Sequence, residues 1–215
     1  MTLLEKMQLK HALSAQAFLL VCTGLILLAT FFLPYATAQG ERDAEIANFE
    51  KMVDTYELLL NVSEESAPDG LQTLQSLNLR QLSMFNCAKF NFFIWDLSNA
   101  DNALDGIDSI SKITIFLALC LPLLSAIIPI AIILNALGRK PFWVLFFIGA
   151  AYGNFLWQRS YLDIEHLVSS GMYRPGIVLR LFPCVCIISV ILALWMWGKK
   201  IFVKRKIKSD RTIQP

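Results

Sequence analysis

The chain has 215 residues, of which 56% are hydrophobic and 17% are charged, and its formal net charge is +2. Its mean hydropathy of +0.54 is higher than an ordinary soluble domain shows. The apolar residues gather in long runs, which is typical of segments that cross a lipid bilayer. The composition therefore argues against a soluble globular protein and predicts an integral membrane protein.

Four apolar runs are each long enough to cross a bilayer, because about 20 residues at about 1.5 Å rise cover roughly 30 Å of hydrocarbon. The predicted spans are residues 12–34, 113–134, 141–161 and 177–198. They predict an all-α membrane protein with four transmembrane helices. A mainly helical extracytoplasmic insertion lies between the first and second spans.

The Lys and Arg residues orient these spans. Two precede the first span, two lie between the second and third, and seven follow the fourth, whereas the same side carries only Glu5 and Asp210 as acids. The positive-inside rule makes residues 1–11, 135–140 and 199–215 cytoplasmic, and residues 35–112 and 162–176 extracytoplasmic. We therefore expect an integral multi-pass protein of the plasma (inner) membrane.

The outer segment 35–112 carries five basic and thirteen acidic residues, so its net charge is 5 − 13 = −8. This sign argues against nucleic acid as a partner on the outer face. The basic segment 199–215 is typical of a topology signal, and it can also contact anionic lipid. The expected partners are therefore the bilayer and a membrane or extracytoplasmic protein.

The first span has an alternative interpretation as a signal peptide. Lys6 and Lys10 precede it, and Ala36-Thr37-Ala38 resembles a signal-peptidase site. However, its apolar run, residues 12–33, is longer than the roughly 7 to 15 residues usual in a signal peptide. We therefore expect an uncleaved first span, with cleavage after Ala38 as the alternative.

The second span contains Pro122, Ser125 and Pro129 on one helical face. Each proline removes one helix hydrogen bond, which favours a bend. This face is predicted to pack against other helices. The alternative is a kinked helix that lines a cavity or moves during transport.

The third span contains Gly149 and Gly153, a spacing that allows two helices to approach closely. The turn 135–140 is short, so the second and third spans are expected to be antiparallel neighbours. We expect the glycines to serve packing within one chain, and a homodimer contact is the alternative.

The outer segment is too long and too periodic to be a simple connection. Apolar residues recur at intervals of three and four along Ile46, Phe49, Val53, Tyr56 and Leu60. This periodicity predicts an amphipathic helix that packs on its neighbours. A turn is expected at residues 63–70, followed by further helical segments over residues 71–85.

Four aromatic residues, Phe90, Phe92, Phe93 and Trp95, make the densest aromatic cluster of the outer segment. They can complete the core of a small domain. The alternative is a surface that contacts the bilayer or a partner.

The sequence contains little that indicates catalysis. Asp163 and His166 fall on one helical face and form the only candidate acid-base pair, whereas Cys87 is the only thiol of segment 35–112. No nucleotide-binding, hydrolase or metalloprotease motif is present, so no cofactor or metal is expected. Asn61-Val62-Ser63 matches a glycosylation sequon on the outer side.

These observations favour a non-enzymatic accessory or interaction protein that binds a partner through its outer helical segment. The alternative is a small-solute transporter, a channel or a subunit of one, built on the kinked second span. An enzyme that uses Asp163 and His166 is a third hypothesis.

Overall fold

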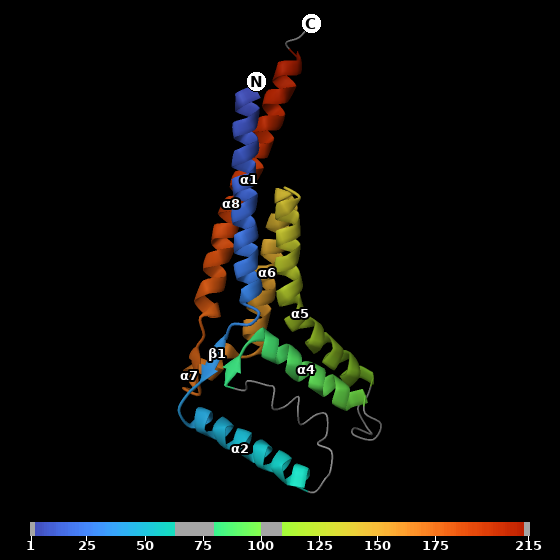
Figure 1. The fold of residues 1–215 in the computed structure, drawn as a ribbon, viewed down its shortest axis with the longest axis vertical. Coiled ribbons are helices and arrows are strands. Elements are labelled where there is room, and N and C mark those ends of the chain that lie inside the picture. Colours follow the sequence, from blue (N-terminus) through green and yellow to red (C-terminus); the bar gives the residue numbers. More distant parts are fainter. Residues whose placement is uncertain (1–2, 63–79, 100–108, 213–215) are drawn as a thin grey trace. The chain divides into compact units, whose positions relative to one another are not determined.

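The computed structural model describes residues 3–62, 80–99 and 109–212, and the side-chain surroundings of residues 15–51, 80–92 and 120–202. Most of these residues are helical (Figure 1). The helices are α1 (Leu3–Ala29), α2 (Glu41–Val62), α4 (Met84–Asn99), α5 (Ser109–Leu137), α6 (Pro141–Tyr161), α7 (Ile164–Ser169) and α8 (Val178–Thr212). Three short strands accompany them: β1 (Ala36–Ala38), β2 (Gln81–Leu82) and β3 (Tyr173–Pro175).

The helix predicted in the outer segment is confirmed as α2. Of its predicted apolar stripe, Ile46 is buried and Phe49 is exposed, and the side chains of Val53, Tyr56 and Leu60 lie outside the described residues.

Gly40 precedes α2 at a φ of +58°, a left-handed conformation that glycine adopts without strain. Glu41 and Asp43 in the first turn stabilise the helix, because their negative charges interact favourably with the positive end of the helix dipole. The turn predicted at residues 63–70 and most of the helical segments predicted over 71–85 lie outside the described residues.

Three helices have limits that differ from the predicted spans, and α5 covers Ser109–Leu137 where 113–134 was predicted. Helix α8 continues through the basic segment to Thr212, so residues 199–212 are helical. Lys and Arg are good helix formers, and Gly198 alone does not stop the helix. At the other end of the chain, α1 stops at Ala29, before a turn in which the Leu33 N–H donates to the Thr30 carbonyl.

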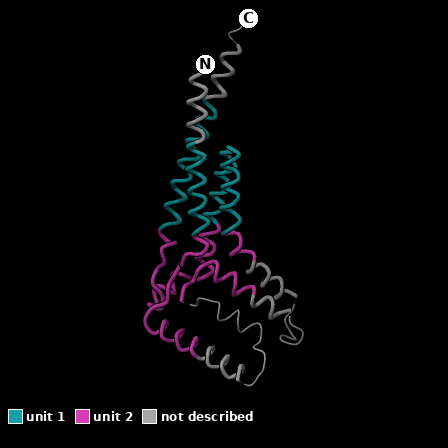
Figure 2. Tube along the Cα trace, in the orientation of Figure 1, with its two compact units in different colours: residues 1–29, 126–153, 181–215 teal, residues 30–125, 154–180 magenta. Residues whose placement is uncertain are grey.

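The chain divides into two compact units, which Figure 2 colours separately. The first unit takes its described residues from 1–29, 126–153 and 181–215, and the second from 30–125 and 154–180. The helices α5, α6 and α8 therefore each contribute residues to both units.

The first unit has a core of apolar side chains on its helices. Residues that are at most 2% exposed here are Leu20, Leu27, Ile132, Ala136, Val144, Ile148, Ala193 and Met196. A Cβ at Gly24 would lie 2.6 Å from Ile133 Cγ1, so this glycine permits the close approach of α1 and α5. Small residues at such contacts allow tight helix packing.

Two helices of the described chain are long and apolar enough to cross a membrane, judged by length and composition. The qualifying segments are Cys120–Leu137 in α5, with a mean hydropathy of 2.3, and Val178–Phe202 in α8, with 2.4. The described part of α1 adds a shorter apolar segment, Ala15–Ala29. These helices are consistent with association of the chain with a membrane.

The second unit contains a small antiparallel sheet in the order β2-β1-β3. Ala36 lies opposite Leu82 on one side and Pro175 on the other, and Thr37 lies opposite Gln81 and Arg174. The prediction of an all-α protein with a mainly helical insertion did not include these strands. Strands of two or three residues are too short to produce a detectable alternation of polar and apolar residues.

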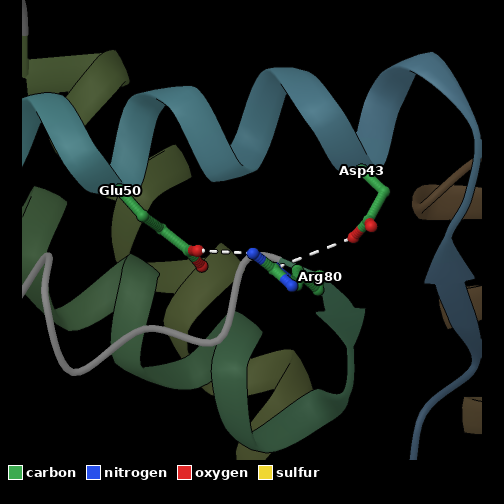
Figure 3. A network of polar contacts seen from close by, with 3 residues as sticks. All are labelled: Asp43, Glu50 and Arg80. Carbon is green, nitrogen blue, oxygen red and sulfur yellow. Dashed lines mark hydrogen bonds and ion pairs between the residues drawn. The ribbon is translucent and has the colours of Figure 1, made fainter.

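An ion-pair cluster links α2 to the residue that precedes β2 (Figure 3). Arg80 Nη2 lies 2.9 Å from Glu50 Oε2, and Arg80 Nε lies 3.7 Å from Asp43 Oδ1. Asp43 and Glu50 are seven residues apart, so both project from one face of α2 toward the guanidinium. The side chains are about 40% exposed, so the pairs contribute at most about 1 kcal/mol and mainly fix geometry.

Gly176 lies directly against the chain segment that enters β1. A Cβ at this position would overlap the Pro34 carbonyl oxygen and lie 2.6 Å from the Pro34 carbonyl carbon. In addition, the Gly176 N–H donates to the Tyr35 carbonyl over 2.8 Å. Since the obstructing atoms belong to the backbone, no side-chain rotation can relieve the overlap.

We therefore expect Gly176→Ala to destabilise the protein by about 2 kcal/mol or more. The matched control is Gly153→Ala, because a Cβ at Gly153 meets nothing within 4 Å among the described residues. Thermal unfolding of both variants in detergent measures the difference. Equal melting temperatures would contradict the close approach at Gly176.

Candidate functional site

A cavity of about 570 Å³ lies in the second unit. Helix α2 contributes Arg42, Glu45, Ile46 and Phe49, and α4 contributes Asn86, Cys87, Phe90 and Asn91. Gln81, Leu82, Tyr161, Leu162 and Tyr173 complete the described wall. The spacing of the α2 residues is that of one helical face, and this is also true of the α4 residues. One face of each helix therefore forms the wall of the cavity, and the predicted apolar pattern of α2 contributes Ile46 and Phe49 to it.

The start of α4 is fixed by a helix cap beside this cavity. Ser83 Oγ accepts a hydrogen bond from the Asn86 backbone N–H over 3.1 Å, the usual contact of a residue that caps a helix N-terminus. Asn86 Nδ2 in turn donates to the Gln81 carbonyl over 2.8 Å. These bonds hold the first turn of α4, and with it Cys87 and Phe90, against β2.

The charged groups at the cavity are already paired within the chain. Arg42 Nη1 lies 2.9 Å from Glu45 Oε2, and Arg42 also makes a side-chain hydrogen bond with Tyr173. These two charges cancel, and the remaining lining is mostly aliphatic and aromatic. The cavity therefore suits an apolar group rather than an ion.

Phe90 and Phe92 of the predicted aromatic cluster are each 44% exposed but lie differently relative to the cavity. Phe90 lines the cavity, and Phe92 is not among its lining residues. The side chains of Phe93 and Trp95 lie outside the described residues. Lys89 Nζ lies 4.9 Å from the centre of the Phe85 ring, on the same helix.

The Cys87 thiol lies in the wall of this cavity. Burial raises its pKa to about 11, because a thiolate is poorly solvated in apolar surroundings. The thiol is therefore protonated at neutral pH and is a poor nucleophile. This argues against a cysteine-based reaction at the cavity.

A network of buried polar side chains joins the residue before β1 to α5 and α6. Tyr35 Oη donates to Gln158 Oε1 over 3.1 Å, and Gln158 Nε2 donates to Ser125 Oγ over 2.6 Å and to the Leu121 carbonyl over 3.1 Å. Asn154 Nδ2 donates to the same Ser125 hydroxyl over 3.0 Å. Tyr35 and Gln158 are at most 2% exposed, and burial raises the pKa of Tyr35 well above its usual value.

This network gives the predicted proline face a structural role. Ser125 bonds across to α6, and Pro122 and Pro129 are buried. One cavity bordered by Pro122 has a volume of about 10 Å³, which holds at most about one water. The arrangement around Ser125 fits the interpretation of this face as a packing surface.

Gly149 and Gly153 are exposed, and nothing described lies within 4 Å of a Cβ built on either. In the described part of the chain, no helix therefore packs closely against these two positions.

Asp163 and His166 are exposed, and neither shows the buried geometry of an acid-base pair. Asp163 precedes α7 at a φ of +47° and makes no side-chain cap. The nearby Glu165 pairs with Arg159 at 2.6 Å. No group of three or more His, Cys, Asp or Glu side chains that could hold a metal occurs among the described residues.

The sequence alone does not identify Gln158, Asn154 or Tyr35, because isolated amide and phenol side chains form no recognisable motif. The available signal was an Asn and a Gln four residues apart in an apolar segment, which places both amides on one helical face. No protein-family model, curated protein or solved structure matches this chain.

The buried network predicts a graded loss of stability. Tyr35→Phe removes one hydrogen bond and should cost about 1 kcal/mol. Gln158→Leu removes the acceptor of Tyr35 Oη, one of the two amide donors to Ser125 and the side-chain donor to the Leu121 carbonyl, and should cost about 2 kcal/mol. Asn135→Leu is the control, since the Asn135 side chain donates only to the Ala131 carbonyl of its own helix. Unfolding in detergent measures all three. A loss for Asn135→Leu as large as that for Gln158→Leu would contradict the network.

The pKa of Cys87 predicts how fast it is alkylated. Because burial raises this pKa to about 11, the thiolate fraction should grow about tenfold for each pH unit from about pH 7 to about pH 10. The measurement uses iodoacetamide on a variant in which Cys22, Cys120, Cys184 and Cys186 are changed to Ser. The same variant unfolded in guanidinium is the control, and its alkylation rate should level off at about pH 9. A folded protein that also levels off there would contradict the burial.

Proposed function

We propose that this chain is an integral membrane protein with four transmembrane helices, and that its extracytoplasmic part binds an apolar segment of a partner protein without catalysis. The apolar cavity lined by Phe49 and Phe90 is the observation that carries the binding proposal. Its volume of about 570 Å³ lies within the range typical of ligand sites in proteins.

Exposed apolar side chains support all four spans. In α1, Phe18 is 67% exposed, and in α6 Phe146 is 56% exposed. Helices α5 and α8 carry similarly exposed large apolar residues, among them Leu134 and Ile187. Such surfaces are unfavourable in water and favourable in lipid. The distribution of Lys and Arg then favours cytoplasmic termini and a location in the plasma (inner) membrane.

Retention of the first span is supported by the position of β1. This strand pairs with both of its neighbours, and Ala36 and Ala38 are buried within the sheet. Cleavage after Ala38 would remove the middle strand and Tyr35 together. A retained α1 is therefore part of the proposal.

The partner segment is expected to be apolar and flanked by basic residues. The cavity offers an apolar interior, with Phe49 38% and Phe90 44% exposed. Segment 35–112, which supplies most of its wall, has a net charge of −8. Charge complementarity across an interface speeds association and selects partners, so Lys or Arg beside the apolar segment fits this surface.

The transporter alternative receives no support from the surroundings of Pro122, because the adjoining cavity is too small for a solute path. The homodimer alternative at Gly149 and Gly153 stays open, because a second copy of the chain can cover these exposed positions.

The binding proposal predicts different effects for two equally exposed aromatics. Phe90→Ser should weaken partner binding at least about tenfold, because a buried aromatic anchor contributes about 2 kcal/mol or more. Phe92→Ser, which removes a ring outside the cavity, should change binding by less than about twofold. Crosslinking and mass spectrometry from native membranes identify the partner, and titration with that purified partner measures both variants.

Equal behaviour of the two variants would overturn the assignment of the cavity as the binding site. Both variants should elute as single species in detergent, which controls for misfolding.

A further inference from the structure

A second cavity, with a volume of about 370 Å³, lies in the first unit where α6 begins beside α8. Its walls include two lysines and several large apolar side chains, namely Lys140, Phe142, Trp143, Trp197, Lys200 and Ile201. Two cationic groups and three aromatic rings thus border one open cavity. The binding proposal for the outer segment makes no use of this cavity.

The turn between α5 and α6 positions the lysines. The Gly138 N–H donates to the Leu134 carbonyl and the Lys140 N–H to the Asn135 carbonyl, which closes the end of α5. Arg139 takes a left-handed φ of +52°, and its carbonyl accepts a hydrogen bond from Lys200 Nζ over 3.1 Å. An ammonium group has three donors, so this bond leaves two for a ligand.

The positive charge at this cavity has no acidic counterpart nearby in sequence. Residues 135–147 and 181–208 contain no Asp or Glu, although they include Arg139, Lys140, Lys199 and Lys200. Pro141 is the first residue of the 21-residue helix α6, whose first turn adds the positive end of a helix dipole. These charges favour an anionic ligand.

The apolar part of the wall restricts the kind of anion. The Phe142 and Trp197 rings meet edge to face, with centroids 6.2 Å apart. Large parts of three phenylalanine side chains of α6 and α8 are exposed: 58% of Phe142, 56% of Phe146 and 67% of Phe202. Trp and Phe in such positions are typical of the headgroup level of a bilayer. A free inorganic anion gains no favourable contact from these apolar surfaces, whereas a lipid acyl chain can pack along them.

We propose that this cavity binds the headgroup of an anionic phospholipid, with Lys140 and Lys200 contacting the phosphate. The acyl chains lie along the exposed apolar residues of α6 and α8. This inference rests on the proposed membrane topology, because the cavity must face a leaflet that contains anionic lipid. It does not depend on the partner-binding proposal for the outer segment.

The test is native mass spectrometry of the full chain in detergent, titrated with dioleoyl phosphatidylglycerol or dioleoyl phosphatidylcholine. Phosphatidylglycerol should bind at least about fivefold more tightly than phosphatidylcholine, and Lys140→Gln or Lys200→Gln should each weaken its binding about fivefold. Lys199→Gln is the matched control, because the Lys199 ammonium lies 4.7 Å from the centre of the Trp195 ring and does not line the cavity. Its effect should stay below about twofold.

Three results would overturn the proposal. Equal losses of lipid affinity for Lys199→Gln and Lys200→Gln would indicate non-specific attraction to the basic helix. Equal affinity for the two lipids would show that the headgroup charge does not contribute to binding. Competition by inorganic phosphate as strong as that by phosphatidylglycerol would assign the site to a free anion.

Alkaline extraction of expressing membranes tests the membrane topology separately. Release of the chain would contradict the four-span topology, and with it the lipid site.

Discussion

The backbone pairing of residues 35–39 is the constraint on which the second unit depends. The Tyr35 N–H donates to the Leu82 carbonyl and the Ala38 N–H to the Arg80 carbonyl, both over 2.8 Å. On the other side, the Gln39 N–H donates to the Met172 carbonyl over 3.0 Å. One short segment therefore holds together stretches that are far apart in sequence. Because buried backbone groups must be paired, loss of this strand would leave donors and acceptors of both neighbours unsatisfied.

The cavity of the second unit follows from this pairing. The bonds of Tyr35 and Ala38 place β2 beside β1, and the Ser83 cap starts α4 directly after β2. Tyr173 of β3 reaches Arg42 of α2, while Arg80 reaches Glu50 on the same helix. The helices α2 and α4 are thus tied to the sheet by polar contacts, and their apolar faces line the space that is left.

A different use of polar groups occurs around Gln158. This side chain uses both ends of its amide, accepting from Tyr35 and donating to Ser125 and to the Leu121 carbonyl. A hydrogen bond in apolar surroundings is directional, so it fixes the rotation of one helix against another where apolar packing alone would tolerate sliding. The cavity at the start of α6 differs in kind, because two lysines, Lys140 and Lys200, line its wall.

The sequence by itself determined the long apolar helices, the asymmetry of charge and the amphipathic helix α2, because hydrophobic periodicity and charge are local properties. It could not determine the sheet, since β1, β2 and β3 have two or three residues each and owe their conformation to partners more than 40 or 130 residues away. Equally, the pairing of Tyr35 with Gln158, the close approach at Gly176 and the cavity that Phe90 lines depend on which surfaces meet. These were decided only by the tertiary structure, because hydrogen bonds and cavities form between segments that the sequence separates.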